Sequence, residues 1–186
     1  MSKIVFVDSE ISHSGEICDL GAVTPEGGRI HTSSHSKFSA FVSGCNYVCG
    51  HNLIAYDLKY IRNLILGDYI AIDTLTISPL LFPKKPYHHL LKDYKIQTEQ
   101  LNDPANDAAL CMELFFDEVE AFNALDEKLK AVFFALIGTR REYIGFFDYV
   151  DYISAADAES LIRERCAERP AITALSAIAS TISTQS

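Results

Sequence analysis

Three acidic groups in the chain carry the side chains that could do chemistry together. The first is Asp8-Ser9-Glu10, which follows the apolar run Ile4 to Val7, a pattern typical of a central strand. Residues two apart in a strand project from the same face, so Asp8 and Glu10 point into one site. Two carboxylates held this close repel unless they are protonated or bridged by a cation. The alternative, a strand end whose acids face water, is less favoured because the preceding strand is predicted to be buried.

The other two groups each stand at the head of a predicted helix. Residues 50–57, GHNLIAYD, end at Asp57, and residues 102–107, NDPAND, end at Asp107. An acid at a helix start is stabilised by the helix dipole, so a cap is the alternative reading of Asp57 taken alone. Capping does not explain the preceding pair His51-Asn52. Each group alone would be a weak signal, but all three, in this order and at these separations, form a strong joint signal.

The elements that must position these groups are mainly strands near the N-terminus and mainly helices later in the chain. Three strands over Lys3–Val7, Ile17–Val23 and Arg29–Ser33, the last two joined by turn residues, predict an antiparallel meander. The further elements that we expect are a helix at Ser36–Val42, a strand at Tyr47–Gly50, a helix at Asp57–Leu66, a strand at Tyr69–Thr74, and helices at Tyr87–Tyr94, Asp107–Phe122, Leu125–Ile137 and Ala155–Glu168. The fold class is therefore α/β, followed by a helical extension.

These motifs resemble those of the DEDD superfamily of 3′-to-5′ exonucleases, which includes the proofreading subunits of DNA polymerases, ribonuclease T and oligoribonuclease. Asp8 and Glu10 match its first motif, Asp57 its second, and Asp107 its third. The segment Ile72-Asp73-Thr74 is also similar to a strand end of the family. The resemblance implies a ribonuclease H-like domain over residues 1–122, with a five-stranded mixed sheet flanked by helices.

The resemblance also implies a metal-dependent exonuclease that acts on single-stranded DNA or RNA 3′ ends. Its metal ligands would be Asp8, Glu10, Asp57 and Asp107. Four carboxylates carry about four negative charges, which two divalent cations balance, and hard oxygen ligands favour Mg²⁺ or Mn²⁺. Two such ions activate a water on one side of a phosphodiester and stabilise the leaving 3′-oxygen on the other.

One position departs from the family pattern. In the His branch a histidine, the general base, stands five residues before the last Asp, where this chain has Asn102. Asparagine accepts no proton, and losing a general base costs about 10²- to 10⁴-fold in rate. Two hypotheses follow. One is a slower nuclease that relies on metal-bound hydroxide or on a substitute base such as Asp103, His88 or His89. The other is a non-catalytic domain that binds nucleic acid or regulates a larger repair protein.

Substrate contacts are expected from His51 and Asn52 and from a basic stretch that includes Lys84 and Lys85. An ordinary solvated loop and helix face is the equal alternative for the lysines. The stretch around residues 78–109 is also similar to the exonuclease-like domain at the N-terminus of some bacterial RecQ-type DNA helicases. That similarity implies a helicase domain in the same parent chain and favours DNA as substrate.

Composition bounds the remaining possibilities. The chain has 186 residues and a formal charge of −9, which argues against binding nucleic acid mainly through a broad basic face. No apolar run has the length of a signal peptide or a membrane span, and five scattered cysteines suit a reducing compartment, so we expect a cytoplasmic protein with free thiols. Residues 123–170 are expected to form the helical extension, in which the aromatic residues between 143 and 152 pack into a core, and 171–186 form an uncharged tail or linker.

Two other readings fit the sequence less well. Cys45, Cys49 and His51 are spaced closely enough to suggest a zinc site, but no second ligand pair follows at zinc-site spacing. A haloacid-dehalogenase-like phosphatase would use Asp8 as nucleophile, but that chemistry requires an Asp rather than Glu10 two residues later.

Overall fold

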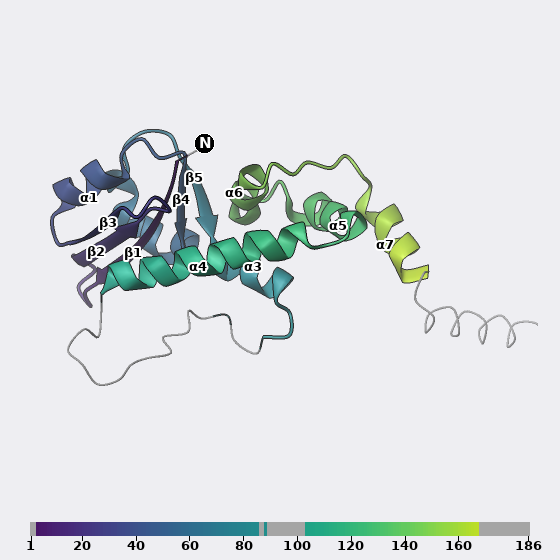
Figure 1. The fold of residues 1–186 in the computed structure, drawn as a ribbon, viewed down its shortest axis with the longest axis horizontal. Coiled ribbons are helices and arrows are strands. Elements are labelled where there is room, and N and C mark those ends of the chain that lie inside the picture. The colour runs from purple at the N-terminus through teal and green to yellow at the C-terminus, as the bar shows by residue number, and fades with distance from the viewer. Residues whose placement is uncertain (1–2, 86–87, 89–102, 168–186) are drawn as a thin grey trace, which may run out of the picture.

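A five-stranded mixed sheet forms the centre of the protein (Figure 1). The computed structural model describes residues 3–85, 88 and 103–167. The strands are β1 (Ile4–Ile11), β2 (Ile17–Val23), β3 (Arg29–Thr32), β4 (Tyr47–Gly50) and β5 (Ile70–Asp73), in the spatial order β3-β2-β1-β4-β5. β1, β2 and β3 form the predicted antiparallel meander, whereas β4 and β5 run parallel to β1 and to each other. The prediction of an α/β fold with a five-stranded mixed sheet flanked by helices is confirmed.

Seven α-helices are described, and their bounds match the expected ones in part. They are α1 (His35–Val42), α2 (Leu58–Ile61), α3 (Thr74–Leu81), α4 (Pro104–Asn123), α5 (Glu127–Ile137), α6 (Arg141–Tyr149) and α7 (Ala158–Ala167). The single helix expected over Asp57–Leu66 is wrong: a π-helical turn, η1 (Leu53–Asp57), precedes α2, and a 3₁₀ turn, η2 (Arg62–Leu64), follows it. Apart from residue 88, the helix expected over 87–94 lies outside the described residues, as does the tail 171–186.

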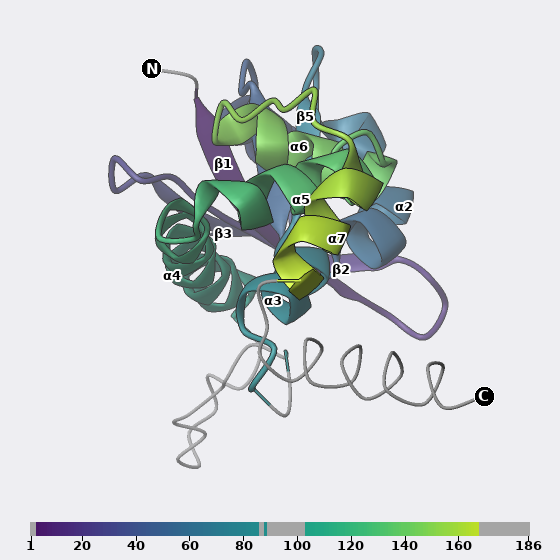
Figure 2. The ribbon, with the colours of Figure 1, turned by 90° about the vertical axis from the view of Figure 1, so that its right-hand side faces the viewer.

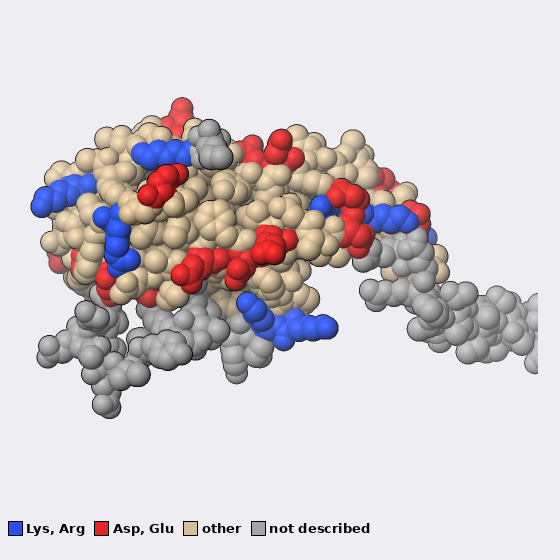
Figure 3. Space-filling view, in the orientation of Figure 1, with Lys and Arg blue, Asp and Glu red and all other residues tan. Residues whose placement is uncertain are grey.

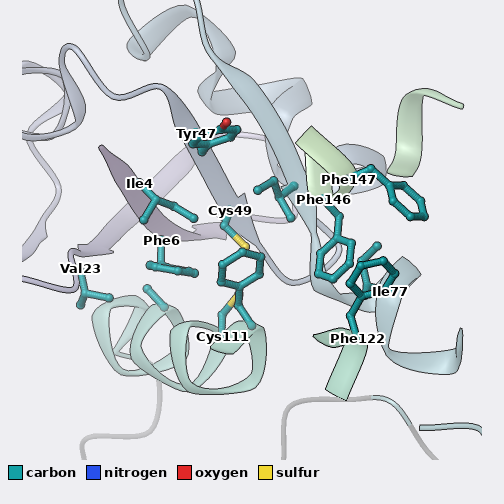
Figure 4. Packing of buried hydrophobic residues seen from close by; sticks show 13 residues of the cluster. Ile4, Phe6, Val23, Tyr47, Cys49, Ile77, Cys111, Phe122, Phe146 and Phe147 are labelled. Carbon is teal, nitrogen blue, oxygen red and sulfur yellow. The ribbon is translucent and has the colours of Figure 1, made fainter. Parts of the chain in front are cut away.

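The sheet is covered on both faces, and alternation along β1 divides the core accordingly. Ile4 and Phe6 belong to one cluster with buried residues of α3, α4 and α6, whereas Val5 and Val7 belong to a second cluster with buried residues of α1 and α2. The first of these clusters is drawn in Figure 4, where Phe6 lies over α4 and Phe122 lies beside Phe146. Since successive side chains of a strand point to opposite faces, Asp8 and Glu10 continue the row that faces α4.

The helices after α4 share the core of the sheet. Phe146 and Phe147 of α6 are buried, and Phe122 of α4 packs edge-to-face on both rings at centroid distances of 5.5 and 5.7 Å. The prediction that the aromatic stretch packs into a core is therefore confirmed for these residues. Figure 2 looks along the molecule from the end where α5, α6 and α7 lie. None of the described helices has both the length and the apolar character that crossing a membrane requires.

Candidate metal centre

Three of the four predicted acidic ligands meet at the end of β1. One carboxylate oxygen each from Asp8, Glu10 and Asp107 lies within 4.8 Å of the other two, and all three residues are half-buried. Asp8 and Glu10 project from β1, and Asp107 comes from the first turn of α4. Among the residues that the structure describes, this is the one group of three or more acids, histidines or cysteines with metal-site spacing.

A glycine in β2 allows α4 to reach this position. Gly21 lies directly opposite Asp8 in the antiparallel pair, on the face that α4 covers. A Cβ atom at Gly21 would come within 2.1 Å of the Pro104 carbonyl carbon and the Ala105 nitrogen. The first turn of α4 therefore rests on the bare backbone of β2, and this close approach brings Asp107 over the end of β1.

Asp103 fixes where α4 begins. It is the N-cap residue: its Oδ1 accepts a hydrogen bond from the Ala105 backbone N–H at 2.9 Å. Pro104 follows at the first helical position, where its missing N–H costs nothing. The other carboxylate oxygen of Asp103, Oδ2, accepts a hydrogen bond from Arg29 Nη2 at 3.0 Å, and His31 Nδ1 lies 3.3 Å from Asp103 Oδ1. Asp103, expected as one possible substitute base, is thus already engaged through both oxygens.

Asp57 lies apart from the group of three. It is buried at the end of η1, and its Oδ1 accepts a hydrogen bond of 2.5 Å from the Ser9 hydroxyl. Ser9 stands between Asp8 and Glu10 and therefore projects from the opposite face of β1. Burial raises the pKa of Asp57 to about 6, although the Ser9 hydrogen bond lowers it. Its role as a ligand stays a prediction, since the structure places it against Ser9.

The loop that carries His51 and Asn52 is held by Asp73 at the end of β5. The Asp73 carboxylate accepts hydrogen bonds from the backbone N–H groups of Asn52 at 2.8 Å, Ile54 at 2.9 Å and Leu75 at 3.0 Å. Asn52 has φ of 67°, a left-handed conformation that asparagine tolerates better than most residues. Burial raises the pKa of Asp73, and these three hydrogen bonds lower it. One carboxylate thus caps α3 and shapes the loop before Asp57.

Two basic residues beside the acids, Arg29 and His31, were not predicted. Arg29 and His31 of β3 project toward α4, and His31 Nε2 also contacts the Asp19 carboxylate on β2. Asp19 lies directly opposite Glu10. Arg29 and His31 stand two positions apart in a predicted strand, which places both on one face. This spacing is the signal from which the pair could have been predicted.

Of the other predicted residues, some follow α3 and some lie outside the described residues. Lys84 and Lys85 are exposed after α3, and Lys85 Nζ stands 4.1 Å from the centroid of the Phe82 ring. His88 is half-buried, and its Nδ1 has no hydrogen-bond partner among the described residues. Asn102 and His89 lie outside the described residues. Glu113, Asp117 and Glu120 of α4 are exposed. Figure 3 shows acidic side chains in red along the lower part of this face of the molecule, where α4 runs in Figure 1.

The donor set at the end of β1 fits a hard divalent cation. All three side chains offer carboxylate oxygens, which Mg²⁺ and Mn²⁺ prefer, and their spacing lets one ion contact more than one of them. No protein-family model matches the chain, and no curated protein matches it.

Proposed function

We propose that this protein is a metal-dependent 3′-to-5′ exonuclease that hydrolyses phosphodiester bonds at single-stranded nucleic acid ends, with a ribonuclease H-like fold. The observation that carries the proposal is the convergence of Asp8, Glu10 and Asp107, from elements about a hundred residues apart, within 4.8 Å. The mixed sheet, with β4 and β5 parallel to β1, is compatible with that fold. The same three residues match motif positions of the DEDD exonucleases.

Each residue has a defined part in this proposal. Asp8 and Glu10 hold Mg²⁺ or Mn²⁺ at the end of β1, and Asp107 completes the site from α4. When bound, the ions supply the positive charge that an acidic protein lacks, polarise the attacking water and stabilise the leaving 3′-oxygen. Ser9 orients the Asp57 carboxylate through its 2.5 Å hydrogen bond. The Asp73 carboxylate holds the His51-Asn52 loop next to this end of the sheet.

A second candidate is a non-catalytic domain that binds nucleic acid ends. Asn102 stands where the His branch has its general base, and the neighbouring Asp103 caps α4 and pairs with Arg29. Because both oxygens of Asp103 are engaged, this residue is poorly placed to accept a proton from an attacking water. The specific observation in favour of this candidate is therefore the engagement of Asp103.

A nuclease assay separates the two candidates. End-labelled single-stranded DNA and RNA are incubated with the protein and Mn²⁺ or Mg²⁺, beside Asp8→Asn and the control Asp117→Asn, which changes an exposed acid elsewhere on α4. We expect stepwise shortening from the 3′ end that Asp8→Asn slows by more than about 100-fold, since losing an outer-shell partner alone costs about 10- to 100-fold.

The outcomes differ clearly. Shortening that Asp8→Asn leaves intact would refute the metal-dependent nuclease. No shortening by the wild type, with activity gained in Asn102→His, would support the non-catalytic candidate. The comparison of DNA with RNA identifies the substrate, which the sequence motifs do not distinguish.

A further inference from the structure

The first turn of α4 is attached to β2 and β3 by a set of polar contacts that lies next to the three acids. Arg29 makes three of them: Nη2 donates to Asp103 Oδ2 at 3.0 Å and to Asn106 Oδ1 at 2.7 Å, and Nη1 donates to the Ala105 carbonyl at 3.2 Å. One guanidinium thus contacts three of the four residues directly before Asp107. The rigid fork of arginine suits such a set, because its donors keep a fixed geometry.

His31 extends the same attachment to the acidic strand pair. It lies opposite Gly21, which itself lies opposite Asp8, so the three residues form one row across β3, β2 and β1 beneath α4. Its ring contacts Asp19 through Nε2 and stands 3.3 Å from Asp103 through Nδ1. One imidazole, that of His31, therefore links Asp19, which lies opposite Glu10, to Asp103, the N-cap of α4.

These polar contacts and the apolar core hold different parts of α4 in place. α4 has 20 residues, and its later turns are anchored by buried apolar side chains such as Cys111, Phe115 and Phe122. The first turn rests on Gly21, which offers backbone and no side chain. Arg29 and His31, which are 44% and 41% exposed, fix the sideways position of that turn. Asp107 belongs to the same first turn, so its distance from Asp8 and Glu10 depends on them.

We propose that Arg29, supported by His31, is a positioning residue of the metal centre that holds Asp107 at bridging distance from Asp8 and Glu10. This inference rests on the proposed function, because it assumes that the three acids bind a divalent cation. Arg29 does not touch the ion. It acts through the cap and first turn of α4, and its charge also offsets the repulsion among the acids gathered there.

The test measures Mn²⁺ binding and stability, without nucleic acid. Isothermal titration with Mn²⁺ alone is carried out on the wild type, Arg29→Ala, Arg29→Lys and the control Arg163→Ala, which removes an exposed arginine paired with Glu159 on α7. We expect Arg29→Ala to raise the Kd for Mn²⁺ by about 10- to 100-fold, Arg29→Lys to fall between it and the wild type, and Arg163→Ala to change nothing. The metal-free Tm of Arg29→Ala stays within about 4 °C of the wild type, as for an exposed ion pair.

A second variant distinguishes the positioning of Asp107 from a general loss of stability. Asn106→Ala removes one acceptor of Arg29 and favours the helix, and we expect a smaller rise in Kd in the same direction. Wild-type Mn²⁺ affinity in Arg29→Ala would overturn the inference and leave the proposed function standing. A large fall in metal-free Tm for Arg29→Ala, with wild-type affinity in Asn106→Ala, would overturn it as well. A wild type that binds no Mn²⁺, with Asp8→Asn indistinguishable from it, would overturn both proposals.

Discussion

Glu118 on α4 is fully buried, and replacing it with glutamine should change how stability depends on pH. Its Oε1 accepts a hydrogen bond from the Ser78 hydroxyl of α3 at 2.6 Å, and its Oε2 is buried without a hydrogen-bond partner among the described residues. Burial raises the pKa of Glu118 from 4.5 to about 8, with the Ser78 hydrogen bond acting in the opposite direction. At neutral pH the folded protein therefore holds this carboxyl group protonated.

The sign of the effect follows from proton binding in the two states. Between the unfolded pKa of 4.5 and the folded pKa of about 8, the folded state binds the proton and the unfolded state releases it, so the free energy of unfolding falls as pH rises. One pH unit within this window corresponds to about 1.4 kcal/mol. Raising the pH from 5 to 7 therefore lowers the free energy of unfolding of the wild type by roughly 2.5 kcal/mol through Glu118. Glu118→Gln has no carboxyl group at this position and should keep most of that free energy.

Urea unfolding in the presence of a chelator, at pH 5, 6, 7 and 8, measures this difference. Burying the carboxamide of Glu118→Gln also costs free energy, but that cost does not depend on pH. The quantity to compare is therefore the slope of the unfolding free energy against pH. Glu113→Gln, at an exposed position on the same helix, is the control and should follow the wild type. Parallel pH profiles for the wild type and Glu118→Gln would refute the reasoning.

Two glycines make a contrasting pair of further predictions. Gly21→Ala would push a methyl group into the backbone of Pro104 and Ala105, and it should both raise the Kd for Mn²⁺ and lower stability by about 1 to 3 kcal/mol or more; unchanged affinity in the titration would contradict the close approach. Gly145→Ala would place a methyl carbon 2.2 Å from the Ala71 carbonyl oxygen, which outweighs the higher helix propensity of alanine; urea unfolding should show a similar loss with Mn²⁺ affinity kept, and a stabilised variant would contradict this.

The strands could be predicted because their signals are local. The apolar run before Asp8 and the turn after Val23 mark β1, β2 and the start of β3 at or near their observed bounds. β1 extends to Ile11, beyond the apolar run, because Glu10 still pairs with Asp19 although neither side chain is apolar. The resemblance to the DEDD exonucleases led us to expect Asp8, Glu10, Asp57 and Asp107 around one site, and the geometry brings three of them, Asp8, Glu10 and Asp107, together.

Other features depend on contacts that no local pattern reveals. α3 was not predicted. Pro79 lies inside it and cannot donate a backbone hydrogen bond, yet Asp73 caps the helix and Ile77 is buried against the core. The position of Asp57 against Ser9 depends on a π-helical turn that replaces the first turn of the expected helix. The attachment of α4 by Arg29 joins residues about 75 positions apart, a pairing that a single sequence does not display.

The two outer strands of the sheet differ in how they are guarded against other molecules. At β5, α6 lies so close that Gly145 approaches the Ala71 carbonyl. At the opposite edge, β3 has only four residues and presents Arg29 and His31, whose polar groups contact the cap and first turn of α4 and, through His31 Nε2, Asp19 of β2. Short, charged or covered edges discourage a foreign strand from adding to a sheet. The contacts that orient Asp107 therefore also help to keep this sheet from growing into an intermolecular one.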